Sequence, residues 1–161
     1  MIRQRLGKDL LFFDGGMGTL LQEKGLAPGE LPETWNLTHS EEIYKIHRQY
    51  IEAGSDIILT NTFGANALKF HDDSCSLEEI IKAAVSHVKK AEREALLQTG
   101  DERKIYTALD VGPTGKLLKP MGDLEFETAY EAFKEVVILG EQAGADLIHI
   151  AVSYTHLTLP T

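Results

Sequence analysis

The sequence predicts a parallel α/β fold, namely the first half of a (β/α)8 TIM barrel with about four strand–helix units. Short apolar runs alternate with amphipathic helical patterns, as in folds that pack helices against a parallel sheet. Polar and glycine-rich segments follow these runs, and barrels carry their sites at such strand ends. A doubly wound sheet would fit the same alternation. A complete barrel needs about 250 residues, so the 161 residues here suffice for about half of one.

Four short apolar runs are the expected strands, over residues 10–13, 56–60, 104–109 and 146–150. Continuous apolar character is typical of parallel strands, which are buried on both faces. An internal repeat supports this order of elements. Its two copies, Ala53-Gly-Ser-Asp-Ile-Ile58 and Ala143-Gly-Ala-Asp-Leu-Ile148, share a helix end, a glycine, an aspartate and the start of a strand.

Long helices are expected between the strands, over residues 38–54, 76–99 and from 125 to 140 or beyond. Capping-box spacing marks the first two starts, at Thr38–Glu41 and Ser76–Glu79. The last helix carries an apolar stripe that we expect to face the sheet. The stripe consists of Phe126, Tyr130, Phe133, Val136 and Val137.

The composition, 43% hydrophobic and 25% charged, is typical of a globular domain. A net charge of -9 argues against nucleic acid and anionic membranes as partners. No apolar stretch approaches the roughly 20 residues of a membrane-spanning helix. A single cysteine and the absence of a signal-peptide pattern predict a reducing, cytoplasmic location.

Three segments that follow expected strands are candidates for ligand binding. They are Asp14-Gly-Gly-Met-Gly18, which opens a helix, Thr60-Asn-Thr-Phe-Gly64 and Asp110-Val-Gly-Pro-Thr-Gly115. Backbone N–H groups of a glycine turn at a helix start can hold an anion. Hydrogen-bonding side chains beside a ring suit a small polar ligand. Ordinary turns explain the first and third segments about equally well, and the spacing of the second is weak evidence by itself.

Other possible ligand residues are weaker candidates. His71-Asp-Asp73 with Cys75 resembles a metal cluster. A surface loop is the stronger interpretation, because no second pair of ligands is evident elsewhere. His47 and His87 fall within expected helices, where histidines are more often packing or surface residues.

Longer motifs run in order along the chain. They are Leu11-Phe-Phe-Asp-Gly-Gly-Met-Gly-Thr19, Pro32-Glu-Thr-Trp-Asn36, Ile46-His-Arg48, Gly54-Ser-Asp-Ile-Ile-Leu-Thr-Asn-Thr-Phe-Gly-Ala-Asn66 and Asp110-Val-Gly-Pro-Thr-Gly-Lys-Leu-Leu-Lys-Pro-Met-Gly-Asp123. Together they resemble the homocysteine S-methyltransferase family. The similarity is greatest to its cobalamin-dependent branch, the homocysteine-binding module at the N-terminus of methionine synthases, and it extends over residues 6–150.

This resemblance implies a barrel in which homocysteine binds at the carboxyl ends of the strands, with its sulfur on a zinc ion held by three cysteines. Zinc lowers the thiol pKa, so that a thiolate attacks the methyl donor. In this branch the donor is methylcobalamin, recharged from 5-methyltetrahydrofolate on separate cobalamin and folate modules of the parent chain. The implied homocysteine-binding residues are Asp14, Gly15, Gly16, Gly18, Thr60, Asn61, Thr62, Phe63, Asp110, Gly112 and Pro113.

The sequence also departs from the family pattern. After the fourth strand the family continues with Glu-Thr, and the Glu meets the amino group of homocysteine, whereas Ala151 and Val152 stand here. The family's zinc cysteines belong to the sixth and eighth strands, and Cys75 falls in a variable loop. We therefore expect these residues to supply no catalytic group and to bind neither zinc nor cobalamin.

Residues 1–150 are interpreted as the half barrel and residues 151–161 as a foreign tail. Residues 152–161 can be back-translated to a DNA sequence that resembles the end of a transposase-based sequencing-library adaptor. The adaptor's preceding bases would turn a codon that begins with G into the alanine codon at 151. Glutamate codons also begin with G, so the hypothesis is that the natural chain continues with Glu-Thr.

Alternatives remain open at the level of the sequence. Stand-alone members of the family take the methyl group from S-methylmethionine or betaine, although residues 61–66 and 116–123 favour the cobalamin type. A truncated, non-catalytic half barrel is the preferred interpretation of the 161-residue polypeptide itself, and its open edges predict dimerisation, aggregation or a partly molten state. An unrelated barrel enzyme for phosphorylated substrates is disfavoured, because its phosphate loops would follow the seventh and eighth strands.

Overall fold

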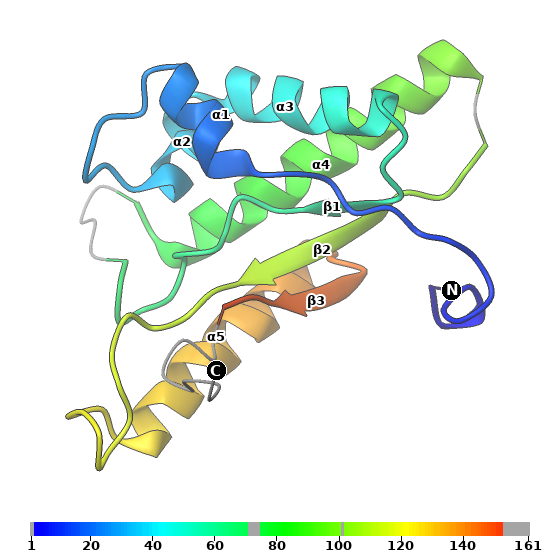
Figure 1. Cartoon of the computed structure of the whole chain (residues 1–161). Coiled ribbons are helices and arrows are strands. Elements are labelled where there is room, and N and C mark those ends of the chain that lie inside the picture. The colour runs from blue at the N-terminus through cyan, green and yellow to red at the C-terminus, as the bar shows by residue number, and fades with distance from the viewer. Residues whose placement is uncertain (1, 71–74, 101, 153–161) are drawn as a thin grey trace, which may run out of the picture.

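Parallel strands form an open sheet in the computed structural model, which describes residues 2–70, 75–100 and 102–152. The strands β1 (Ile57–Leu59), β2 (Tyr106–Val111) and β3 (Leu147–Ile150) are adjacent in that order. Helices connect successive strands, as parallel pairing requires (Figure 1). The predicted α/β class is thereby confirmed. The segment 71–74 and residues 153–161 of the expected tail lie outside the described residues.

The helices occupy the expected intervals. They are α1 (Met17–Glu23), α2 (Trp35–Thr38), α3 (Ser40–Glu52), α4 (Leu77–Thr99) and α5 (Phe126–Ala143), with short 3-10 turns η1 (Ile2–Gln4) and η2 (Pro32–Thr34). No helix in the described parts of the chain is both long and apolar enough to span a membrane.

One of the two predicted capping boxes forms. Ser76 Oγ accepts a hydrogen bond from the N–H of Glu79, and the Glu79 carboxylate accepts one from the N–H of Ser76. The prediction of a second box at Thr38 was wrong. His39 precedes α3 without a side-chain cap, and the Thr38 hydroxyl instead donates back to the carbonyl of Thr34. Thr38 closes α2, so its hydroxyl serves the preceding helix.

The predicted first strand, residues 10–13, is present only as a single parallel bridge. Phe13 pairs with Ile57, and the carbonyl of Phe12 accepts hydrogen bonds from the N–H groups of Asp56 and Ile57. Leu10 and Phe12 remain 76% and 56% exposed. This segment has β1 on one side and nothing described on the other, so its pairing is too short to count as a strand.

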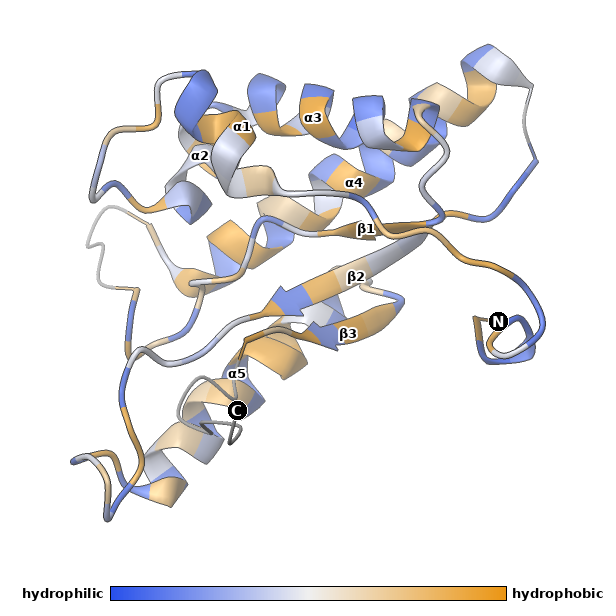
Figure 2. Ribbon diagram, viewed as in Figure 1, coloured by the Kyte–Doolittle hydropathy of each residue, from blue (hydrophilic) through white to orange (hydrophobic). Residues whose placement is uncertain are grey.

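The sheet has one face covered by helices and one concave face. Side chains alternate along strands, and register partners in parallel strands share a face. Ile58 and Leu109 therefore lie on the covered face, where they pack against α3, α4 and α5. Ile57 and Ala108 lie on the concave face, packed with Leu147 and Leu11. Figure 2 shows orange on all three strands, interrupted by blue on β2 and β3, and helices that carry both colours.

The sheet is strongly curved toward the concave face. Adjacent strands lie about 4.8 Å apart, and β1 and β2 separate the segment that carries Phe13 from β3. Even so, the ring centroids of Phe13 and His149 lie 5.5 Å apart. Side chains from the two edges therefore meet across the concave face, as half of a closed barrel requires.

The expected inward face of α5 was partly wrong. Val136 is buried, but Phe126 and Tyr130 are 66% and 53% exposed. Small residues face the sheet instead, because α5 lies so close to β2 that a methyl group on Gly140 would overlap the Leu109 side chain. Phe126 and Tyr130 are consequently turned away from β2, whereas Phe133 is half-buried and packs against the cluster that contains Leu109.

Candidate functional site

A cavity of about 280 Å³ lies at the carboxyl ends of the first segment, β1 and β2. It is lined by eight residues that the sequence analysis singled out, Asp14, Gly15, Gly16, Gly18, Thr60, Asn61, Phe63 and Asp110. Met17, Pro32, Glu33 and Leu59 complete its wall. Three segments far apart in the sequence thus converge on one hollow, because parallel strands present their carboxyl ends at the same edge of the sheet.

Thr62, Gly112 and Pro113, also predicted, do not line this cavity but support it. The Thr62 hydroxyl donates to the carbonyl of Asp110 at 2.8 Å and lies 2.7 Å from the Thr60 hydroxyl. Gly112 donates its N–H to the carbonyl of Phe63, and a Cβ at Gly112 would collide with that residue. The carbonyl of Pro113 accepts a hydrogen bond from Asn66.

The backbone of Asp110 is held by a closed ring of hydrogen bonds. Its N–H donates to Thr60 Oγ1 at 3.2 Å, while its carbonyl accepts from Thr62 Oγ1. Since the Thr62 proton is engaged, the bond between the two hydroxyls must use the proton of Thr60. The threonines after β1 therefore fix the backbone of Asp110 on β2.

Asp14 is the most perturbed acid at the cavity. Its Oδ2 accepts the N–H of Leu59 at 3.0 Å, and its buried Oδ1 has no hydrogen-bond partner among the described residues. Burial, reinforced by the nearby charge of Asp110, raises the pKa of Asp14 to about 7. Asp14 is therefore poised to ionise near neutral pH and to accept a cationic group.

The carboxylate of Asp110 is hydrogen-bonded to His149, which was not among the predicted site residues. Burial raises the pKa of Asp110, and the hydrogen bond from His149 opposes that rise. His149 Nδ1 lies 2.9 Å from Asp110 Oδ1. The two residues are register partners on β2 and β3, which is the signal that could have identified His149 once the strand alignment was known.

The segment around η2 forms a wall of the cavity that the sequence analysis did not assign to the site. Glu33 is 3% exposed, its Oε1 accepts the N–H of Gly64, and its Oε2 lacks a partner among the described residues. Asn36 donates to the carbonyl of Asn61 at 2.8 Å, and Asn61 donates to the carbonyl of Pro32 at 2.7 Å. The motif at residues 32–36 was the available signal.

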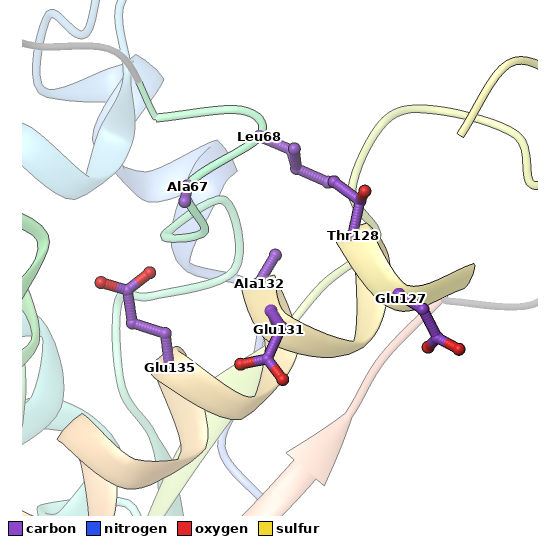
Figure 3. Close-up of a pocket in the computed structure, with 7 residues that line it drawn as sticks. All are labelled: Ala67, Leu68, Glu127, Thr128, Glu131, Ala132 and Glu135. Atoms are coloured by element: carbon purple, nitrogen blue, oxygen red, sulfur yellow. The ribbon is translucent and has the colours of Figure 1, made fainter. Parts of the chain in front are cut away.

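A second hollow, of about 620 Å³, lies between Leu68 and α5 (Figure 3). Its carboxylates, Glu127, Glu131 and Glu135, point in different directions and do not converge on one point. None of the strand-end motifs contributes to its lining. The strand-end cavity is therefore the better candidate for a specific site.

The described residues do not fit a zinc site of three thiolates. Cys75 is the one cysteine of the sequence, and it packs against the apolar cluster between α4 and α5 rather than lining the cavity. No group of three or more metal-ligating side chains gathers within residues 2–70, 75–100 and 102–152. His71, Asp72 and Asp73 lie outside these ranges. His47 is buried within α3, and His87 Nε2 bonds the carbonyl of Asn36.

Residues 11–157 match the protein family described as Homocysteine S-methyltransferase. The chain belongs to this family. A curated relative, the methionine synthase of Mycobacterium leprae, is 30% identical over 151 residues, a match that spans 90% of this chain and 12% of the relative.

Solved structures of the homocysteine methyltransferase MmuM from Escherichia coli share the fold. The metallated form aligns with a TM-score of 0.78 at 22% identity, over 92% of this chain and 56% of MmuM. The oxidized form aligns with a TM-score of 0.76 at 23% identity, over 91% of this chain and 55% of MmuM. The chain thus spans about half of that barrel, which confirms the predicted half-barrel architecture.

Proposed function

We propose that this chain is the substrate-holding half of a homocysteine S-methyltransferase barrel, and that its strand-end cavity binds the amino-acid end of L-homocysteine. The observation that carries this proposal is the pairing of two carboxylates, Asp14 and Asp110, with a glycine turn around one small cavity. An α-amino acid presents an ammonium and a carboxylate on one carbon, and the cavity offers a complement to each.

The ammonium group is assigned to the carboxylates. Asp14 Oδ1 is buried and without a hydrogen-bond partner among the described residues, so a donor from the ligand would satisfy it. A cation placed there also stabilises the ionised form of Asp14 against the burial that raises its pKa.

The ligand carboxylate is assigned to the backbone N–H groups of the turn 15–18. Gly16 precedes α1 with no side-chain cap, so the first N–H groups of the helix have no side chain to satisfy them. Thr60, Asn61 and Phe63 form the opposite wall and would limit the length of the ligand. The sulfur end would then point out of this half of the barrel.

The chemistry of methyl transfer is assigned to parts of a parent protein outside these residues. The proposed donor is methylcobalamin, charged from 5-methyltetrahydrofolate on cobalamin and folate modules, and the proposed thiol activator is a zinc ion held by cysteines of the second half barrel. The 12% coverage of a methionine synthase supports a parent of this kind. S-methylmethionine or betaine is the alternative donor. We propose that the 161-residue chain alone is inactive.

Substrate binding can be tested on the chain itself by titrating ¹⁵N-labelled protein with L-homocysteine. We expect amide shifts at Gly15, Gly16 and Gly18, and their loss in Asp14→Ala. A matched control is Asp123→Ala, because Asp123 is exposed and does not line the cavity. Shifts that spread evenly over the chain, or none at saturating ligand, would contradict the assignment.

The division of labour can be tested by supplying L-homocysteine with each donor in turn. We expect no methionine from the chain alone with methylcobalamin, S-methylmethionine or betaine. Methionine formed from any of them would overturn the proposal that this half is inactive by itself.

The identity of the tail is a separate proposal. We propose that residues 151–161 are foreign and that glutamate and threonine follow Ile150 in the parent. Sequencing the source DNA from codon 100 to well past codon 161 tests this. A clean genomic read that encodes Ala151 and Val152 would contradict this proposal.

A further inference from the structure

His149 occupies a position from which it touches the candidate site without forming part of its wall. It lies on β3 as the register partner of Asp110, so both side chains project from the concave face. The side chain of Asp110 is 13% exposed and that of His149 is 35% exposed. The histidine is therefore the more accessible partner of this pair.

The contacts of His149 restrict its ring on two sides. Nδ1 lies 2.9 Å from Asp110 Oδ1, and the ring packs at a tilt against Phe13, with centroids 5.5 Å apart. Since a carboxylate accepts hydrogen bonds, Nδ1 carries the proton in this contact. Phe13 immediately precedes Asp14, so His149 is in contact with both of the segments that supply the carboxylates.

Asp110 needs such a partner, because the threonine ring holds only its backbone. Thr60 and Thr62 engage the N–H and the carbonyl of Asp110, and neither threonine bonds its carboxylate. The bond from His149 occupies Oδ1, and Oδ2 receives no hydrogen bond from the described residues. The carboxylate therefore keeps one free oxygen in a defined orientation.

We infer that His149 is a positioning residue, which holds the Asp110 carboxylate so that its free oxygen joins Asp14 in binding the ammonium group of the ligand. This inference rests on the proposed function, because it takes an α-amino acid as the ligand. It adds the third strand to the site and gives the Asp110 carboxylate a residue that fixes its orientation.

The first test measures binding by isothermal titration calorimetry. L-homocysteine is compared with 4-mercaptobutyrate, which has the same thiol and carboxylate but lacks the ammonium group. In His149→Leu, which removes the donor, we expect the affinity for L-homocysteine to fall about tenfold or more, with the affinity for 4-mercaptobutyrate unchanged. In His149→Asn, whose amide can place an N–H near the position of Nδ1, most of the lost affinity should return.

The second test needs no ligand. The ¹³C resonance of the Asp110 carboxylate is titrated in the wild type and in both variants. Loss of the donor in His149→Leu should raise the pKa of Asp110, and His149→Asn should restore it toward the wild-type value. Ile148→Leu is the matched control, because Ile148 is adjacent on β3 but projects from the opposite face. Far-UV circular dichroism checks that each variant is folded.

The outcomes separate this inference from the function on which it rests. Absence of L-homocysteine binding in the wild type would contradict the proposed function, and the titration of Asp110 would then decide the role of His149 alone. Equal binding of L-homocysteine by the wild type and His149→Leu would overturn ammonium positioning. An unchanged Asp110 titration in His149→Leu would overturn the inference altogether.

Discussion

The two copies of the internal repeat begin their strands with the same pair of hydrogen bonds. In the first copy, Asp56 donates its N–H to the carbonyl of Phe12 and accepts the N–H of Phe12 on its carboxylate. In the second copy, Asp146 makes the equivalent pair with Thr107. Gly54 and Gly144 precede them with φ of 111° and 93°. Each aspartate thus clamps its strand to the preceding one.

The strands that follow these clamps differ in burial. Ile58 of the first copy is 0% exposed, whereas Ile148 of the second copy is 44% exposed. Both isoleucines project from the helix-covered face, but only Ile58 packs in a core cluster, with α3 and α4. Similar sequences therefore form the same local connection, and the elements packed on each side decide whether the strand becomes core.

Low pH should have the largest effect on stability, because it destabilises α3, the helix that packs on the strand of the first copy. His47 lies in α3, and burial, followed by the charge of His87, lowers its pKa to about 3. An unfolded histidine titrates near pH 6.5, so this stabilising contribution is complete above that pH and is lost as the pH falls toward 3. A tenfold change in proton affinity corresponds to about 1.4 kcal/mol, so the titration of His47 can lower the free energy of unfolding by at most about 5 kcal/mol.

Urea unfolding at pH 7 and pH 4.5 measures this effect. We expect the wild type to lose about 3 kcal/mol more than His47→Leu over that interval. His39→Leu is the control, because His39 is exposed. The same pH dependence in the wild type and in His47→Leu would show that His47 does not titrate as a buried group.

High pH should have the next largest effect, through Asp14, whose carboxylate accepts the N–H of Leu59 at the carboxyl end of β1. Its folded pKa of about 7 exceeds the unfolded value near 3.9. Its contribution is therefore complete below about pH 3.9 and is lost as the pH rises through 7. At pH 8 we expect Asp14→Asn to raise the free energy of unfolding, measured with urea, by up to about 4 kcal/mol. The variant should also lose the binding of L-homocysteine. A stability gain of equal size at pH 4 would refute the role of ionisation.

Truncation of the two equivalent isoleucines tests the difference in burial directly. Ile58→Ala should lower the free energy of unfolding by about 3 kcal/mol, because it leaves a cavity in a closed core. Ile148→Ala should cost less than about 1 kcal/mol, because its side chain is partly solvated. Chemical denaturation of both variants measures the two losses of unfolding free energy, which can then be compared. Equal losses would mean that the second strand is covered in solution.

Removal of the clamps should give losses that differ less between the two copies than the losses from truncating the isoleucines. Asp56→Ala removes a hydrogen bond from a residue that is 8% exposed, and we expect a loss of about 2 kcal/mol. Asp146→Ala should cost about 1 kcal/mol, since Asp146 is exposed and also bonds Lys89 at 2.6 Å. Thermal unfolding with Asp123→Ala as control checks both. No loss in either variant would show that the repeated aspartate is not a clamp.

Much of the candidate site could be predicted because its residues follow strands directly in the sequence. Asp14, Thr60 and Asp110 meet at one cavity as expected from the parallel order of the strands. His149 and Glu33 could not be found in this way. The role of His149 depends on the register of β3 against β2, and that of Glu33 on how the segment at η2 folds back onto Gly64.

The sequence by itself determined the features that depend on neighbouring residues. The capping box at Ser76, the glycine ends before the repeated aspartates and the α/β alternation all arise from hydrogen bonds and side-chain periodicity within a few residues. Only the tertiary structure decided that α5 turns Phe126 outward, that the first segment pairs by a single bridge, and that Phe13 meets His149. These depend on close approach between elements and on sheet curvature, which are set by the packing of distant segments rather than by local preference.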